Sequence, residues 1–549
     1  MFHGWNHRGG HYLLLIFTAG LLFMPNLGGP TLWDIDEGNN AEAAREMLRS
    51  ANWRVPTFNY QLRVDKPALL YWFQILAYRL FGVGEFAARL PSALAGILTI
   101  LLTYELGRLM FGPATGLLAG VVLASSILFC ASAHFANPDM LLVCSIVAAF
   151  LFFWQGFTNE RYAFVRVSLA MGLAVLAKGP VGLVLPAAII VAFLYWVGKL
   201  RLLWKPGLVA GALAFAAVAA PWYIWVGVET KGAFLLQFWQ KHNVNRFLGA
   251  MENHSGPVYY YFIILLVGLA PWSAFLAPTS WHAIRSIRPI GSAESAAEPF
   301  VAFRFLVCWF AMFFIFFTIS QTKLPNYILP LYPAAAIMTA RFLVRWQEDK
   351  TNTPAWLMPL CFGCVILSGI LFIGGVLIVS GGWKLGILRG QTFPELTKWA
   401  VCGVIPIAGG ILAWWLHGQH RQKALVVLSA TAVVFLAPLA AGGGASLNRH
   451  KAPKYLAESI LSAQREKEIR IGCLYYFQPS LVFYAQRQVQ AFADPAAANE
   501  FLRLPRQVFL ILPASTWERF EKRPDIRYRF VDRRRDMYRN MDVVLITNR

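Results

Sequence analysis

The chain has 549 residues, of which 57% are hydrophobic and only 14% are charged. Soluble domains carry about 25% charged residues, so this chain has too few charges to cover the surface of a soluble protein of its length. The composition therefore excludes a soluble protein and indicates one that is solvated by lipid. A formal net charge of +21 points to anionic headgroups or phosphate-bearing ligands. The sequence carries no basic, aromatic-interleaved motif of the kind that binds nucleic acid.

Apolar runs long enough to cross a bilayer, which takes roughly 20 residues per helix, recur along the first 441 residues. They predict a mostly α, polytopic membrane protein with about thirteen transmembrane helices. Two short runs are separated only by Lys178-Gly179-Pro180, and we predict two helices there rather than one. The thirteen runs are 11–28, 88–108, 114–134, 139–157, 164–177, 180–197, 207–228, 257–277, 301–320, 325–344, 355–379, 398–416 and 424–441.

Lys and Arg in the short loops favour a cytoplasmic N-terminus. The loops that this orientation places inside are the more basic ones, and they are 159–166, 198–206, 341–350 and 417–423. The short loops on the opposite side, 137–139, 178–180 and 320–324, carry at most one basic residue each. An odd number of spans then leaves residues 442–549 outside the membrane.

This tail changes character after Gly442-Gly443-Gly444, which we interpret as a hinge. It has 19 basic and 11 acidic residues. Short β-like runs alternate with helical stretches, which predicts a small α/β domain. The predicted division is a transmembrane domain over 1–441 and an α/β domain over 442–549. The β-like runs are 469–476, 507–512 and 542–547, and the helical stretches are 479–486 and 495–504.

Two outer segments are neither transmembrane nor ordinary loops. In the first segment we expect a polar helix over 37–50 and an amphipathic helix over 67–81. In the second we expect an amphipathic helix over 234–248. Aromatic residues on one face and basic residues on the other are typical of helices that lie in the membrane interface. We expect these helices to roof a cavity at the outer leaflet.

Carboxylates at the outer membrane edge are candidates for catalysis, because an ionisable group there costs free energy unless it is used or paired. Asp34, Asp36 and Glu37 follow the first span, and Asp139 lies in the outer turn before the fourth. N-capping of a helix is the alternative for each of them. Three acids in four residues exceed what one cap requires, so we predict that Asp36, Glu37 and Asp139 belong to the active site.

Cations on the same side are candidates for holding a phosphate. Lys66 follows Asp65 at the start of an interfacial helix, where a surface ion pair is the alternative. For the others the alternative is a snorkelling or capping role. Because they share one leaflet with two carboxylates, we predict a lipid-phosphate enzyme. These further candidates are Lys178, Lys241, His242, Arg246, His254, Lys323 and Tyr327.

Taken together, these motifs resemble the polyprenyl-phosphate-dependent glycosyltransferases of the GT-C fold, and most of all the bacterial aminoarabinose (lipid A) transferases. The resemblance spans the whole chain. Many relatives carry Glu where this chain has Asp65. The motifs are Asp36-Glu37 with the helix to Leu48, Asp65-Lys66-Pro67, Asn137-Pro138-Asp139, Lys178-Gly179-Pro180, His254-Ser255-Gly256-Pro257 and Lys323 to Pro333.

The resemblance implies transfer of 4-amino-4-deoxy-L-arabinose from undecaprenyl phosphate to a phosphate of lipid A, with inversion. The expected partners are this lipid-linked donor, lipid A and the bilayer, with no nucleic acid and a monomeric chain. It implies a bacterial inner membrane location with a periplasmic active site, and resistance to polymyxin and cationic peptides.

A phosphate acceptor is already largely ionised at pH 7, so the main catalytic burden is the charge on the departing polyprenyl phosphate. Lys66 and Arg246 are the first candidates to stabilise that charge, and Lys323 and Tyr327 are the second. No cofactor is required by this scheme. His254 and Asp65 are the candidates if a divalent metal takes part.

Two other functions fit parts of the sequence. A sibling enzyme would move another sugar, such as mannose, onto a protein. A transporter or flippase would carry acidic residues at mid-membrane, whereas the charges of this chain gather at one face.

Overall fold

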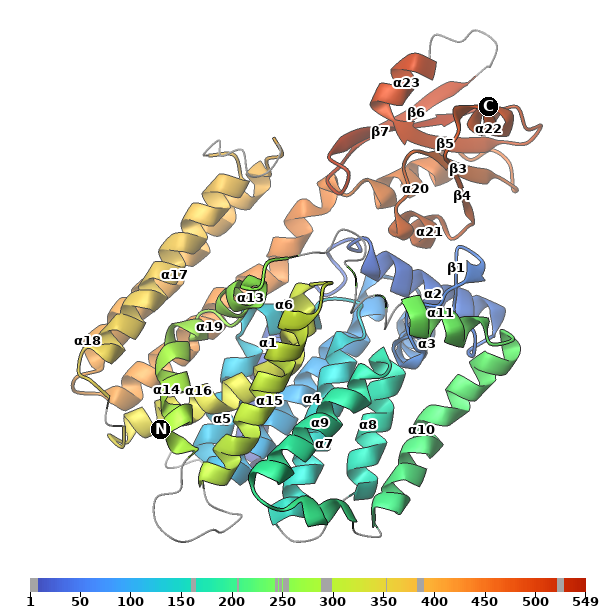
Figure 1. Cartoon of the computed structure of the whole chain (residues 1–549). Helices are drawn as coiled ribbons and strands as arrows, with labels where there is room; N and C mark the ends of the chain where they lie inside the picture. The colour runs from blue at the N-terminus through green and yellow to red at the C-terminus, as the bar shows by residue number, and fades with distance from the viewer. Residues whose placement is uncertain are drawn as a thin grey trace.

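The structure is a computed structural model of the chain, and it describes residues 8–158, 164–204, 207–241, 245, 249, 256–287, 299–351, 353–382, 390–520 and 528–549. Apolar helices form a bundle that makes up most of these residues, and a five-stranded sheet lies at one end of it (Figure 1). The predicted fold class, a helical membrane protein with a small α/β part at its C-terminal end, is confirmed.

Each of the thirteen predicted runs forms a helix or a pair of helices. The α-helices of the bundle are α1 (Arg8–Phe23), α4 (Glu85–Phe111), α5 (Pro113–Ala124), α6 (Ile127–Ala133), α7 (Asp139–Thr158), α8 (Phe164–Lys178), α9 (Val181–Trp196), α10 (Gly207–Glu229), α13 (Tyr260–Gly268), α14 (Leu276–Ser286), α15 (Pro299–Ile319), α16 (Tyr332–Gln347), α17 (Leu357–Val379), α18 (Val404–Leu416) and α19 (Arg421–Pro438). Short helices of other types join them: η1 (Leu200–Trp204), η3 (Trp272–Phe275), η4 (Pro325–Leu331), η6 (Pro394–Gly403), η7 (Leu439–Gly443) and η8 (Gly444–His450).

The number of straight spans is smaller than the number of apolar runs. Eight helices in the described residues are long and apolar enough to cross a membrane, or ten if each of two bent pairs is one span. The chain bends by 68° between α5 and α6, and by 113° between α13 and the helix that follows it. The run 257–277 is therefore not one straight helix, and Pro271 lies at its bend. Three other predicted spans, α1, α8 and α9, are helices of only 16, 15 and 16 residues.

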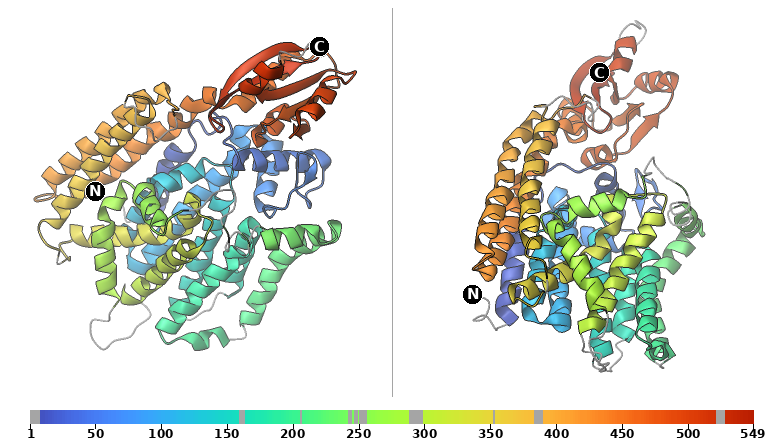
Figure 2. Two further views of the ribbon diagram at one scale, coloured as in Figure 1. Left: turned by 45° about the horizontal axis from the view of Figure 1, so that its top comes forward. Right: turned by 60° about the vertical axis from the view of Figure 1, so that its left-hand side comes forward.

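The predicted interfacial helices are present as α2 (Asp36–Ser50) and α3 (Leu69–Phe81), with a hairpin of β1 (Thr57–Phe58) and β2 (Gln61–Leu62) between them. The third is α11 (Ala233–Trp239), and residues 242–244 and 246–248 of the predicted helix lie outside the described residues. All three lie at the end of the bundle that carries the sheet (Figure 1). The N-terminal end of α1 lies away from the sheet in every view (Figures 1 and 2).

The C-terminal sheet has the strand order β4-β3-β5-β7-β6, in which β4, β3 and β5 are parallel and the other two pairings are antiparallel. The predicted runs form the three central strands. One buried cluster covers each face of the sheet, so the sheet is sandwiched between helices. The elements are α20 (Ala452–Ala463), β3 (Arg470–Leu474), α21 (Pro479–Ala485), β4 (Val489–Phe492), α22 (Pro495–Leu502), β5 (Val508–Pro513), α23 (Ala514–Phe520), β6 (Arg529–Asp536) and β7 (Met541–Thr547).

The last span does not end at the three glycines. Its helical backbone continues through η7 and η8 as far as His450, and Gly443 and Gly444 have helical dihedral angles, with φ of −58° and −65°. The predicted hinge at Gly442-Gly443-Gly444 is therefore wrong, because glycine weakens a helix by only about 1 kcal/mol and does not by itself end it. The division of the chain into domains at residue 441 stays a prediction.

Candidate functional site

One pocket, with a volume of about 260 Å³, collects half of the predicted site residues. The predicted residues in its lining are Asp65, Lys66, Asp139, Lys178 and Tyr327. These come from the loop before α3, the start of α7, the end of α8 and η4, so four distant parts of the sequence meet here. Most of the remaining lining is apolar and includes Leu142, Val181, Val184, Leu185, Phe316 and Phe317.

Gly179 places the ammonium group of Lys178 at this pocket. Its φ of +82° lies in the left-handed region, and a Cβ atom there would come within 2.6 Å of the ring of Phe238. The glycine therefore ends α8 directly after Lys178 and lets α11 approach, which confirms that α8 and α9 are separate helices. Lys178 forms an ion pair with Asp139, and its Nζ lies 4.9 Å from the centroid of the Tyr327 ring.

Asp139 is the first residue of α7, and it is 3% exposed. The backbone N–H of Asp139 donates a hydrogen bond to the side-chain oxygen of Asn137 at 3.1 Å. Its carboxylate pairs with Lys178 and also accepts a hydrogen bond from the amide of Asn326. Asn326 lines the pocket but was not predicted as a site residue, although it lies in the quoted motif from Lys323 to Pro333.

The loop before α3 supplies Asp65 and Lys66. Asp65 lies 3.1 Å from the guanidinium of Arg63, which is buried and donates to the hydroxyl of Tyr71 at 3.0 Å and to Oδ1 of Asn40 at 3.2 Å. Arg63 therefore fixes the loop from inside. It was not predicted, because nothing in the local sequence distinguishes it from a surface arginine.

Asp36 does not line the pocket. It is an exposed residue in the first turn of α2. Burial lowers the pKa of Arg63, but the charges around it, those of Asp65 and Asp36 included, raise that pKa above its ordinary value. The charge of Asp36 therefore acts on Arg63, whereas Asp65 is the carboxylate that is paired with it, at 3.1 Å.

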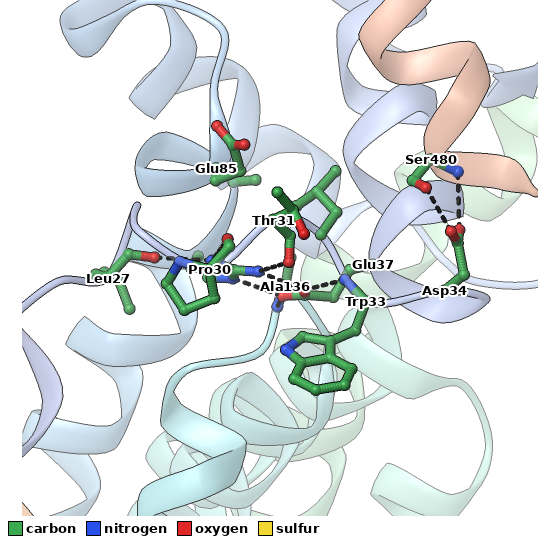
Figure 3. Close-up of polar contacts among 12 residues, drawn as sticks. Leu27, Pro30, Thr31, Trp33, Asp34, Glu37, Glu85, Ala136 and Ser480 are labelled. Carbon is green, nitrogen blue, oxygen red and sulfur yellow. Dashed lines mark hydrogen bonds and ion pairs between the residues drawn. The ribbon is translucent and has the colours of Figure 1, made fainter. Parts of the chain in front are cut away.

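Glu37 is fully buried, and protein groups surround its carboxylate. It pairs with Arg89 at 2.7 Å and accepts hydrogen bonds from the backbone N–H groups of Trp33 at 2.8 Å and Ala136 at 2.7 Å (Figure 3). The pairing and the hydrogen bonds hold the pKa of Glu37 below its ordinary value, although burial alone would raise it. Glu37 thus joins the chain before α2 to α4 and to the outer turn before α7, and it lies outside the pocket that it was predicted to share.

Lys323 lies beside the pocket rather than in its lining. Its ammonium donates to the backbone oxygens of Thr318 at 2.7 Å and Ser320 at 2.8 Å, which satisfies carbonyls at the end of α15. Burial lowers its pKa. Ser320 itself lines the pocket, so Lys323 supports that wall.

Three residues predicted for a phosphate or metal site, His242, Arg246 and His254, lie outside the described residues. Lys241 is described and exposed. Within the described ranges, no group of three or more His, Cys, Asp or Glu side chains is placed to hold a metal ion. The metal role of His254 and Asp65 stays a prediction.

A buried contact joins the segment before α2 to the C-terminal sheet. Asp34 accepts hydrogen bonds from the backbone N–H of Ser480, at 2.8 Å, and from its hydroxyl (Figure 3). Gly38 makes room for this contact, because a Cβ atom there would lie 2.4 Å from the backbone nitrogen of Ser480. Burial raises the pKa of Asp34 to about 7, against the lowering effect of the Ser480 hydrogen bonds. Burial also lowers the pKa of Lys451, which donates to the backbone oxygen of Thr31, to about 7.

We expect Asp34→Asn to reduce the pH dependence of stability between about pH 4 and pH 7. In this window the folded protein holds a proton on Asp34 that the unfolded chain releases, so stability falls as the pH rises. The pKa of Lys451 is lowered in the folded protein, so above pH 7 the unfolded chain holds a proton on Lys451 that the folded protein has released. Stability therefore rises with pH in that range. Thermal unfolding in detergent at pH 4.5 and pH 7 measures the effect, and an unchanged difference between the two melting temperatures would contradict it.

Comparisons with known proteins agree with this architecture. Residues 65–225 match the family model described as dolichyl-phosphate-mannose-protein mannosyltransferase. Undecaprenyl phosphate-alpha-4-amino-4-deoxy-L-arabinose arabinosyl transferases are similar to the chain. The one from Erwinia tasmaniensis is 31% identical over 425 residues, which is 74% of this chain and 73% of the relative. The one from Edwardsiella ictaluri is 32% identical over 347 residues, which is 61% of this chain but only 60% of the relative.

A solved structure has the same fold. The crystal structure of ArnT from Cupriavidus metallidurans bound to undecaprenyl phosphate superposes with a TM-score of 0.83 over 99% of both chains, at 22% sequence identity. The sequence match to the Erwinia relative extends over nearly three quarters of both proteins. The chain therefore belongs to the family of undecaprenyl phosphate-alpha-4-amino-4-deoxy-L-arabinose arabinosyl transferases.

Proposed function

We propose that this chain transfers 4-amino-4-deoxy-L-arabinose from undecaprenyl phosphate to a phosphate of lipid A. The observation that carries the proposal is the composition of the pocket. Its lining combines two cations, Lys66 and Lys178, with many apolar residues, which include Val181 and Phe316. A lipid phosphate needs both kinds of surface, one for its charged head and one for its hydrocarbon chain. Membership of the family supports the identity of the sugar and of its carrier.

The reaction is a displacement at the anomeric carbon of the sugar. An oxygen of the acceptor phosphate forms a bond to that carbon as the bond to the donor phosphate breaks, and the bonding electrons leave with undecaprenyl phosphate. Attack from the side opposite the leaving group inverts the configuration. Lys66 and Lys178 stabilise the negative charge that develops on the departing phosphate, and Tyr327 lines the same pocket.

The acceptor needs little help from a base. A phosphate monoester has a second pKa of about 6, so at pH 7 it is largely a dianion. Asp139 then acts as a positioning residue, because its ion pair with Lys178 fixes the direction of that ammonium group. Asp36 is exposed and does not line the pocket, and the role proposed for it is that its negative charge favours the ammonium group of the aminosugar over a neutral sugar.

We also propose the orientation and the setting of the enzyme. The chain works as a monomer in the bacterial inner membrane, with the N-terminus in the cytoplasm and the pocket and the C-terminal sheet in the periplasm. The position of the α1 N-terminus away from the sheet supports this orientation. Adding an aminosugar to lipid A lowers the negative charge of the outer membrane, and resistance to polymyxin and cationic peptides follows.

Mass spectrometry of lipid A tests the function in a Gram-negative strain that lacks its own aminoarabinose transferase but makes the donor. We expect lipid A to carry aminoarabinose when the chain is expressed, and tolerance of polymyxin to rise. The Lys178→Gln variant, expressed to the same level, serves as the inactive control. Lipid A that stays unmodified in the presence of the folded wild-type protein would overturn the proposal.

Protein mannosylation is a second candidate, because the family model matched by residues 65–225 is described by that activity. Incubating membranes that contain the chain with labelled polyprenyl-phosphate sugars separates the two functions. Label on lipid A supports aminoarabinose transfer, and label on protein supports the alternative.

A further inference from the structure

A second pocket lies outside the membrane bundle, at the junction with the C-terminal sheet. Its volume is about 820 Å³, roughly three times that of the first pocket. The end of α2, the β1–β2 hairpin and the first residues of β3 and β4 all contribute to it. Its polar lining includes Arg49, Tyr60, Arg470, Arg487, Gln488 and Gln490.

The three arginines of this pocket have no anionic partner. Within the part of the chain that the structure describes, the side chains of Arg49, Arg470 and Arg487 form neither an ion pair nor a hydrogen bond. Elsewhere on the same sheet arginines are paired, as Arg533 is with Asp542 and Arg534 with Asp532. Three arginines in the lining of one hollow give it a positive charge, and an anionic ligand there can form charge-assisted hydrogen bonds with them.

The pocket is held in shape by contacts across the junction. The side chain of Asn59 donates to the backbone oxygen of Val489 at 2.8 Å and accepts from its backbone N–H at 2.9 Å. Glu46 accepts hydrogen bonds from the Thr57 hydroxyl at 2.6 Å and from the backbone N–H of Tyr60 at 3.1 Å. The hairpin is thereby fixed both to the edge of the sheet and to α2.

These contacts hold an aromatic ring at the pocket. Asn59 and Tyr60 form the two-residue turn of the hairpin, and both have left-handed backbones, with φ of 53° and 62°. A left-handed tyrosine costs free energy that the contacts around it must supply. Tyr60 remains 48% exposed, so its ring is available to a ligand.

The same segment connects the second pocket to the first. Tyr60 lines one and Lys66 lines the other, and six residues of extended chain span at most about 20 Å. A ligand of a few sugar units has a comparable length. One molecule can therefore reach both pockets.

We propose that the second pocket binds an anionic oligosaccharide, the sugar head of the acceptor glycolipid, and holds it while the acceptor phosphate enters the first pocket. This inference rests on the proposed function. The guanidinium groups recognise phosphate or carboxylate groups of the head, the amides of Gln488 and Gln490 bond to hydroxyls, and the ring of Tyr60 stacks on a sugar ring.

Calorimetry with the full-length protein in detergent tests binding without the reaction. The probe is a deacylated, phosphorylated oligosaccharide prepared from lipopolysaccharide, and inorganic phosphate is a second probe. We expect the wild-type protein to bind the oligosaccharide, and the Arg470→Ala/Arg487→Ala variant to bind it at least about tenfold more weakly. Arg519→Ala, an exposed arginine on α23 outside the pocket, should bind as the wild type does.

Transfer kinetics give an independent readout. For the double variant we expect the KM for the intact glycolipid to rise about tenfold or more, with kcat and the KM for the donor unchanged. Equal binding by wild type and double variant, no binding by wild type, or equal affinity for inorganic phosphate and for the oligosaccharide would each overturn the inference. Oligosaccharide binding that depends on these arginines, in a protein that modifies no lipid A, would support the glycan site while overturning the proposed function.

Discussion

Replacing Lys66 with alanine is expected to lower kcat for sugar transfer by about 10²–10³-fold while the protein still folds. Lys66 lines the first pocket, where we propose that the departing phosphate binds, and its side chain is only half-buried in a loop. Transfer by the purified protein, measured with saturating donor and acceptor, gives the change in kcat.

Two further variants make the Lys66 result specific. Lys66→Arg keeps the positive charge and should recover part of the rate. Lys350→Ala removes an exposed lysine that pairs with Glu348, remote from the pocket, and should leave the rate unchanged. A Lys66→Ala protein with wild-type kcat would remove this residue from phosphate stabilisation.

Replacing Glu37 with alanine is expected to destabilise the protein by about 3–5 kcal/mol, because the buried charge of Arg89 loses its partner. The guanidinium of Arg89 also donates to the backbone oxygens of Leu27 at 2.9 Å and Pro30 at 2.6 Å. A displaced Arg89 would also lose these two hydrogen bonds, so the change destabilises residues 27–35 before α2 as well. Thermal unfolding in detergent measures it.

The conservative variant Glu37→Gln separates a structural role from a catalytic one. Trp33 and Ala136 donate to different carboxylate oxygens of Glu37, so the single side-chain oxygen of glutamine can keep one of these two hydrogen bonds. Glu37→Gln also leaves no cavity, so it should be more stable than Glu37→Ala. For a structural residue, activity and stability fall together across the two variants. A Glu37→Gln protein that melts like the wild type but transfers no sugar would instead make Glu37 catalytic.

The sequence predicts a site residue correctly where its position along the membrane topology is enough to place it. Asp139 and Lys178 were grouped because the predicted topology puts both on one face, and the structure pairs them although they are 39 residues apart. The sequence does not predict the role of a residue that depends on an ion-pair partner far away in the chain. Glu37 and Asp36 are adjacent acids in the sequence, but in the described residues only Glu37 of the two forms an ion pair, with Arg89, which lies 52 residues further along the chain.

The fold, like the site, could be predicted only in part from the sequence. Hydrophobicity located every membrane helix, because length and apolar character alone determine which segments enter lipid. It could not locate bends such as the one at Pro271, which depend on how neighbouring helices pack. The edge strand β6 was missed because four of its eight residues, Arg529 and Arg533–Arg535, are arginines, and their exposure at the sheet edge hides the strand pattern.

The helix that runs without interruption from Arg421 to His450 has a mechanical consequence. Its 30 residues measure about 45 Å at 1.5 Å per residue, whereas the hydrocarbon core of a bilayer is about 30 Å thick. About 15 Å of rod must therefore project beyond the lipid tails or be taken up by tilt. The C-terminal sheet follows this rod directly and is also held to the bundle by contacts such as that of Asp34 with Ser480, so its distance from the lipid tails depends on the thickness of the bilayer. A thicker membrane draws the sheet toward the headgroups, and a thinner one lifts it away.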